Sequence, residues 1–213
     1  MKKIAKYPHL KCTIWISIAA IIVFTVSLIV PCSPWDSILQ NIFAGLITGI
    51  VVTLISSLKS KELKDAEIED QFLKVVHDLY ISSRRAYGDY RKVRNEKDDE
   101  YYEGTYELIA ELQAIESFIG AKDKDERLVR ILGKRPSEFF DTEKSYCFSE
   151  QNKRHSNLYN RLNDKLSFDE EERKIIDQEI NIIRRAHSVL NKKALNRLDE
   201  IFDEKIEIET SVP

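Results

Sequence analysis

The chain has 213 residues, enough for one domain or for one modest domain joined to a membrane anchor. Of its 33 basic and 36 acidic residues, four Lys and one Asp lie in residues 1–57, which leaves 29 basic and 35 acidic residues for 58–213. The acidic excess of this larger part argues against general nucleic-acid binding, which needs a basic surface that releases counterions.

The N-terminal region combines a basic start with an apolar run. Residues 1–12 carry all four of these Lys, and residues 13–30 are uncharged. At about 1.5 Å of rise per residue, a helix over 13–31 is long enough to cross the hydrocarbon core of a bilayer. A signal peptide has a similar pattern, but a second apolar run follows after a few residues. The sequence therefore predicts an uncleaved transmembrane helix.

A second transmembrane helix is predicted over residues 34–57. Ser33 and Pro34 are typical of the N-cap and first position of a helix, and Pro31 ends the preceding one. The short turn makes the two helices an antiparallel hairpin. It contains no Lys or Arg, whereas Lys residues flank both outer ends, so the positive-inside rule places both termini in the cytoplasm. The Lys residues expected to contact lipid headgroups include Lys11, Lys59, Lys61 and Lys64.

Small residues share one face of the second predicted span. Gly45 and Gly49 form a G-x-x-x-G pattern, and Thr53 extends it by one turn. This spacing lets another helix backbone approach closely in lipid. One interpretation is self-association into a homo-oligomer through the hairpin. The other is that this face receives the first helix of the same hairpin.

The rest of the sequence predicts an all-α fold. No Gly or Pro occurs between residues 50 and 87, so the second span should continue as one helix to about Arg94. Further helices are expected over 102–119, ended by Gly120; over 128–132, ended by Gly133; within 137–163; and over 168–206, capped by Ser167. The predicted architecture is a two-helix transmembrane hairpin followed by a cytoplasmic antiparallel bundle, residues 58–213, with long spine helices.

A cluster of basic and aromatic residues marks the end of the first spine helix. The candidate ligand or partner surface consists of Arg84, Arg85, Tyr87, Arg91 and Arg94. Alternating basic and aromatic side chains suit an anionic or nucleotide-like ligand. The alternative is a charged helix end that is neutralised by residues 96–100 and by acidic residues of the last helix.

No catalytic, cofactor-binding or metal-binding residue is predicted. Glycine-rich phosphate loops and the H-E-x-x-H and E-x-x-H patterns are absent from the sequence. The four His have no second ligand at helical spacing, so each is interpreted as a structural or surface residue. None of them follows an Arg at the spacing of HEPN-type ribonucleases. The sequence therefore predicts a non-enzymatic protein without a cofactor.

Two functions fit this layout. One is a membrane-anchored helical protein, in a bacterial plasma membrane, whose bundle binds a protein partner or ligand in the cytoplasm. The other rests on a resemblance: a two-helix hairpin followed by a helical cytoplasmic region resembles the SLATT-type membrane effectors of bacterial anti-phage defence. That resemblance implies oligomerisation and membrane disruption. The chain lacks the soluble helix that usually precedes the hairpin in that group.

Overall fold

The computed structural model describes residues 35–142, 145–164 and 167–210, together with residues 18, 21, 22 and 25. The four isolated residues are helical, but the predicted basic N-terminus and the rest of the first predicted span, 13–31, lie outside the described residues. The chain divides into two compact units, Met1–Lys64 and Asp65–Pro213.

The longest element of the fold is the helix α2, which runs from Trp35 to Val93 and has 59 residues. The continuous helix predicted from the second apolar run into the charged segment is therefore confirmed. The helix ends in a turn, where the backbone N–H of Glu96 donates to the carbonyl of Val93 at 3.0 Å.

The second unit continues with α3 (Asp98–Lys122), α4 (Glu126–Leu132) and α5 (Pro136–Phe140). Gly120 does not end a helix as predicted, because α3 continues to Lys122. Its lack of a side chain instead serves packing, since a Cβ at this position would lie 3.1 Å from Cζ of Phe148. Gly133 does end α4, in the left-handed conformation with φ of 70°.

The last two helices are α6 (Phe148–Asn163) and α7 (Glu170–Thr210). The cap predicted at Ser167 is wrong, because the Asp169 side chain accepts the hydrogen bond of the Glu172 backbone N–H at 2.8 Å. Carboxylates suit the positive end of the helix dipole. The helix α7 continues to Thr210, four residues beyond the predicted end at residue 206.

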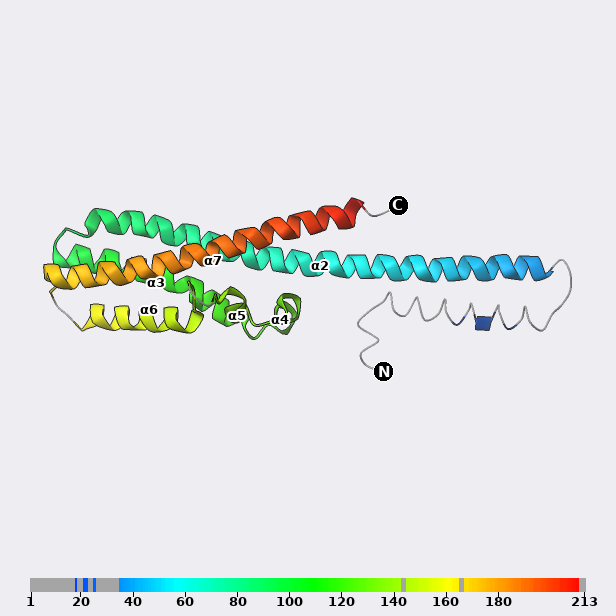
Figure 1. The fold of residues 1–213 in the computed structure, drawn as a ribbon, viewed down its shortest axis with the longest axis horizontal. Coiled ribbons are helices and arrows are strands. Elements are labelled where there is room, and N and C mark those ends of the chain that lie inside the picture. The colour runs from blue at the N-terminus through cyan, green and yellow to red at the C-terminus, as the bar shows by residue number, and fades with distance from the viewer. Residues whose placement is uncertain are drawn as a thin grey trace. The chain divides into compact units, whose positions relative to one another are not determined.

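Side-chain pairs show how these helices run relative to one another. From α2 to α7 the pairs are Glu69–Arg197, His77–Asn191 and Tyr90–Asp177, so one residue number falls as the other rises and the helices are antiparallel. The pairs Tyr102–Asn163 and Tyr106–Tyr159 make α3 and α6 antiparallel in the same way. Figure 1 shows α7 beside the later part of α2, with α3 and α6 packed along them. The antiparallel all-α packing is thus confirmed.

The interior of the second unit consists of two clusters of buried apolar side chains. The first cluster contains Phe72, Leu73, Val76, Ile115, Ile119, Leu128, Phe140, Tyr146, Ala186, Leu190, Ala194 and Ile201. The second contains Tyr90, Tyr101, Leu108, Ile109, Leu112, Leu158, Leu162, Phe168, Ile176, Ile180 and Ile183. Near the end of α7, Phe202 is 64% exposed, whereas its neighbour Ile201 is buried.

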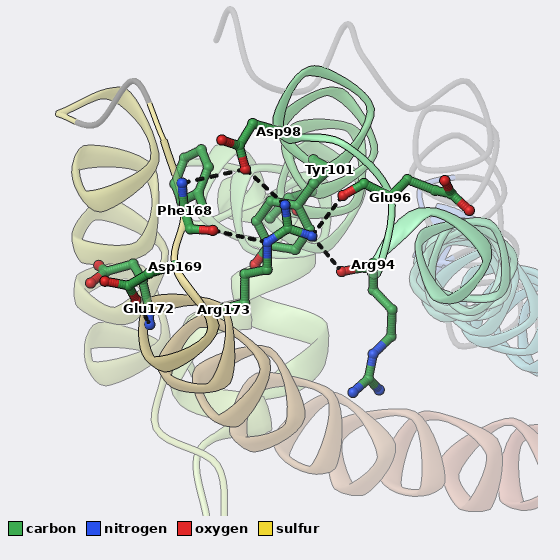
Figure 2. Close-up of polar contacts among 9 residues, drawn as sticks. Arg94, Glu96, Asp98, Tyr101, Phe168, Asp169, Glu172 and Arg173 are labelled. Atoms are coloured by element: carbon green, nitrogen blue, oxygen red, sulfur yellow. Dashed lines mark hydrogen bonds and ion pairs between the residues drawn. The ribbon is translucent and has the colours of Figure 1, made fainter.

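Arg173, in the first turns of α7, holds one end of the bundle together (Figure 2). Its guanidinium donates to the backbone carbonyls of Arg94, Glu96 and Phe168, at 2.9–3.2 Å. It also pairs with Asp98 at 2.8 Å and lies 4.2 Å from the ring centre of Tyr101. One side chain therefore links the turn between α2 and α3, the start of α3 and the link between α6 and α7.

Candidate functional site

The first part of α2 has the composition of a membrane span. Within the described residues, the stretch Asn41–Val93 holds an 18-residue window of mean hydropathy 2.0, none of which is buried. Its apolar side chains are open to the surroundings: Ile42, Ile47, Val51, Val52, Leu54, Ile55 and Leu58 are each between 43% and 60% exposed. By length and composition alone, this part of the helix can cross a membrane.

The small-residue face predicted at Gly45, Gly49 and Thr53 lies on this part of α2. A Cβ added at Gly45 or Gly49 would meet no atom of the described residues within 4 Å. The Thr53 hydroxyl donates to the carbonyl of Gly49 at 2.7 Å, so its polar group is satisfied within the helix. Among the described residues, no side chain therefore occupies the space beside Gly45 and Gly49, where another backbone can approach.

The Lys residues predicted to contact lipid follow the apolar window. Lys61 and Lys64 are exposed, Lys59 is half-buried, and Lys11 lies outside the described residues. No acidic residue precedes Glu62 on this stretch of the sequence after Asp36. The apolar window is therefore followed by Lys59, Lys61 and Lys64, which we call the basic band and among which Glu62 also lies.

The predicted basic and aromatic residues occupy the later part of α2. Arg84, Arg85 and Arg91 are exposed, and Tyr87 is half-buried. The structure adds Arg184 of α7, whose guanidinium lies 3.2 Å from the ring centre of Tyr87. Burial lowers the pKa of Arg184, and the positive charges of Arg84 and Arg91 lower it further. We call Arg84, Tyr87, Arg91 and Arg184 the basic surface.

Neutralisation by acidic residues accounts for only part of this region. Arg94 pairs with Asp177 of α7 at 3.2 Å, as the alternative interpretation expected. In contrast, Arg84, Arg85 and Arg91 have no acidic side chain within ion-pair distance among the residues that the structure describes. The basic surface therefore keeps several positive charges without a counter-charge.

A second candidate site lies inside the bundle, where Glu116 of α3 meets His155 of α6 and His187 of α7. All three side chains are buried, with exposures of 1% or less. The Glu116 Oε1 atom lies 2.6 Å from Nε2 of His187, and its Oε2 atom lies 3.2 Å from Nε2 of His155. The Tyr146 hydroxyl donates to Oε1 at 3.2 Å. We call Glu116, His155 and His187 the buried centre.

The two His determine the charge state of this carboxylate. Burial alone would raise the pKa of Glu116, but the charges of His187 and His155 and the hydrogen bond with His187 outweigh it, and the pKa lies at about 2. Burial raises the pKa of the Tyr146 hydroxyl, and the negative charge of Glu116 raises it further. Glu116 is therefore ionised, and Tyr146 acts as a neutral hydrogen-bond donor to it.

Sequence reasoning did not find the buried centre. A second ligand for each His was sought at helical spacing within one segment, whereas these three residues come from helices that are far apart in the sequence. One signal was available, because Glu116 lies between the apolar residues Ile115 and Ile119 on the buried face of α3, and buried Glu residues usually have a charged partner. The sequence alone does not say which residue supplies that partner.

Comparisons of the chain with protein-family models, with curated protein sequences and with solved structures find no match. The fold defines the class, an all-α protein built on an antiparallel helical bundle.

Proposed function

We propose that the chain is a membrane-anchored, non-enzymatic helical protein. The two-helix hairpin holds it in the bilayer of a bacterial plasma membrane with both termini in the cytoplasm. The bundle, on the cytoplasmic side, binds an anionic ligand or the acidic surface of a protein partner through Arg84, Arg91 and Arg184.

The observation that carries this proposal is the run of exposed apolar side chains on α2. Ile47 is 43% exposed and Val52 is 60% exposed, and the whole apolar window is uncovered. Water-soluble monomers rarely expose a continuous apolar surface of this length. A bilayer supplies the missing cover, and the basic band at Lys61 and Lys64 suits the cytoplasmic headgroup region.

Membrane extraction tests the anchor. We expect the wild-type chain to stay in the membrane pellet after alkaline carbonate treatment. The double variant Ile47→Lys and Val51→Lys should move to the supernatant or be degraded, because each charge at the centre of a span adds about 2.5–3.5 kcal/mol to insertion. The matched control, Phe202→Lys on the exposed face of α7, should stay in the pellet. Wild-type chain recovered in the supernatant would contradict the proposal.

The open face at Gly45 and Gly49 favours a second function, that of a two-transmembrane effector which oligomerises and disrupts the membrane. The space beside Gly45 and Gly49 allows the helix of a second copy of the chain to approach closely. Induced expression would then depolarise cells, and the double variant Gly45→Leu with Gly49→Leu would abolish the effect. If induction leaves the membrane potential intact and the double variant behaves as wild type, the effector function is excluded and the anchored binding protein remains.

A further inference from the structure

The buried centre has the layout of a ligand set rather than of a simple ion pair. Three helices each contribute one donor side chain, and the donor atoms of Glu116, His155 and His187 all lie within 4.8 Å of one another. On α3 and α7 the centre sits where the two apolar clusters meet, since His187 stands between Ile183 of one cluster and Leu190 of the other.

Several polar atoms at the centre are buried without a hydrogen bond. The close approach of Glu116 Oε2 to His155 Nε2 lacks hydrogen-bond geometry, so both atoms are unsatisfied within the described residues. The Nδ1 atoms of His155 and His187 are also buried without a partner. Buried polar atoms are nearly always bonded. The unsatisfied Glu116 Oε2 and His155 Nε2 atoms lie 3.2 Å apart, which indicates a missing partner that accepts a lone pair from each of them. The Nδ1 atoms belong to the far side of the same rings and do not bind the same ion.

A metal ion is the partner that matches these donors. Imidazole nitrogen and carboxylate oxygen are the ligands of zinc in proteins, with bonds of about 2.1 Å and a tetrahedral arrangement that sets ligand atoms about 3.4 Å apart. Glu116 Oε2 and His155 Nε2, at 3.2 Å, already have nearly this separation. Binding requires the carboxylate to release the shorter contact of its other oxygen with His187.

The fourth ligand position also has candidates in the structure. Gln151 lies one turn before His155 on α6, and its Oε1 atom is buried without a hydrogen bond among the described residues. The Tyr146 hydroxyl already lies 3.2 Å from the Glu116 carboxylate. The Gln151 oxygen is the better candidate, because the Tyr146 hydroxyl is a neutral donor to Glu116, and a closed set of four protein ligands is typical of a structural metal site.

We propose that Glu116, His155 and His187 bind one divalent first-row transition-metal ion, with Zn²⁺ as the expected occupant. The site joins α3, α6 and α7 and has a structural role. This inference goes beyond the proposed membrane-anchored function and does not depend on it.

Metal binding is tested first on the wild-type full-length chain, purified in detergent without a histidine tag. After removal of metal with a chelator, titration with Zn²⁺ against a chromophoric competitor should give one tightly bound ion per chain, and the unfolding temperature should rise. Mg²⁺ should produce neither effect, since it prefers oxygen ligands. X-ray absorption at the zinc edge should show two imidazole ligands, which separates this site from adventitious binding near Cys12 or His9.

Variants then assign the ligands. His155→Gln and His187→Gln should each bind Zn²⁺ at least about tenfold more weakly, with the helical content checked by circular dichroism. The control is His77→Gln, which alters a half-buried His that pairs with Asn191 outside the buried centre. This variant should bind Zn²⁺ as the wild-type chain does. The proposal is overturned if the wild-type chain binds no zinc, or if its zinc has fewer than two imidazole ligands. Unchanged zinc binding in both ligand variants would overturn it as well. If a variant loses helical content, the zinc titration and the X-ray absorption of the wild-type chain decide whether the proposal holds.

Discussion

At the scale of single residues, Arg173 shows how much one side chain can organise. Its guanidinium satisfies three backbone carbonyls outside regular helix and one carboxylate, and it covers the ring of Tyr101 (Figure 2). A guanidinium suits this role because it offers five donors in a fixed plane.

Removing this guanidinium should weaken the whole bundle. We expect Arg173→Met to lower the free energy of unfolding by about 2–4 kcal/mol, because several charge-assisted hydrogen bonds are lost and Asp98 loses its partner. Denaturant unfolding followed by circular dichroism measures this change. The neighbouring control Lys174→Met removes only an exposed pair with Glu170 and should change stability by less than about 0.5 kcal/mol. Equal effects of the two substitutions would refute this account of Arg173.

Glu116 makes stability depend on pH. Its pKa in the folded chain, about 2, lies below the ordinary value of 4.5, so its ionisation stabilises the fold fully above pH 4.5. This contribution is lost as the pH falls from about 4.5 to 2. In the presence of a chelator, the wild-type chain should therefore lose stability over this range more steeply than Glu116→Gln. Parallel acid-unfolding curves for the two proteins would contradict this prediction.

At the scale of elements, the close contact between α2 and α3 depends on a residue without a side chain. A Cβ at Gly104 of α3 would overlap with the Cγ2 atom of Val93, the last residue of α2. In contrast, a Cβ added at Gly88, within α2, would meet no atom of the described residues within 4 Å. Adding a side chain at these two Gly residues should therefore change the free energy of unfolding in opposite directions.

Replacing each Gly by Ala separates packing from helix propensity. Gly104→Ala should lower the free energy of unfolding by about 1–3 kcal/mol, because α2 and α3 must move apart. Gly88→Ala should raise it by about 0.5–1 kcal/mol, because Ala favours a helix and meets open space. Thermal or denaturant unfolding of both variants measures the difference. Stabilisation by both substitutions would show that the contact at Gly104 is not tight.

The helices themselves follow from local signals in the sequence, and their ends follow only in part. The absence of Gly and Pro between residues 50 and 87 predicted that α2 is continuous there, and Gly133 predicted the end of α4. Gly120 was misread because packing against Phe148, a contact distant in sequence, decides its role. The same limit applies to Arg173 and the buried centre, where the partners come from separate helices that only tertiary packing brings together.

Only the part of the basic surface that lies on one helix could be predicted from the sequence. Arg84, Tyr87 and Arg91 share one helix face, so helical spacing was enough to group them. Two further facts came from the packing of α7 on α2: Arg184 joins the surface, and Arg94 leaves it by pairing with Asp177. Periodicity within one helix contains no information about the neighbouring helix.

At the scale of the whole molecule, the proposed function predicts that unpaired positive charge binds anions. In the full-length chain, a multivalent anion such as pyrophosphate should raise the unfolding temperature through the basic surface. Arg84→Glu should abolish this shift, because it places a negative charge beside the site. Lys153→Glu makes the same charge change at an exposed position of α6 and should keep the shift. A shift that survives Arg84→Glu would show that the anion binds elsewhere.

The two halves of the molecule have different physical requirements. The first part of α2 exposes its apolar side chains, whereas the second unit buries two apolar clusters and carries an acidic excess. A membrane hairpin that carries a cytoplasmic bundle reconciles these requirements. The proposed function therefore depends on topology, namely on which segments lie on which side of the bilayer.

Labelling with a membrane-impermeant maleimide tests this topology most directly. In a chain with Cys12 and Cys147 replaced by Ser, Cys32 marks the predicted turn of the hairpin, and Ser156→Cys, in a Cys32→Ser background, marks an exposed position of α6. In intact spheroplasts we expect Cys32 to be labelled, whereas the thiol at position 156 should be labelled only after lysis. Labelling at position 156 in intact spheroplasts, or protection of Cys32 there with labelling only after lysis, would contradict the membrane hairpin with a cytoplasmic bundle.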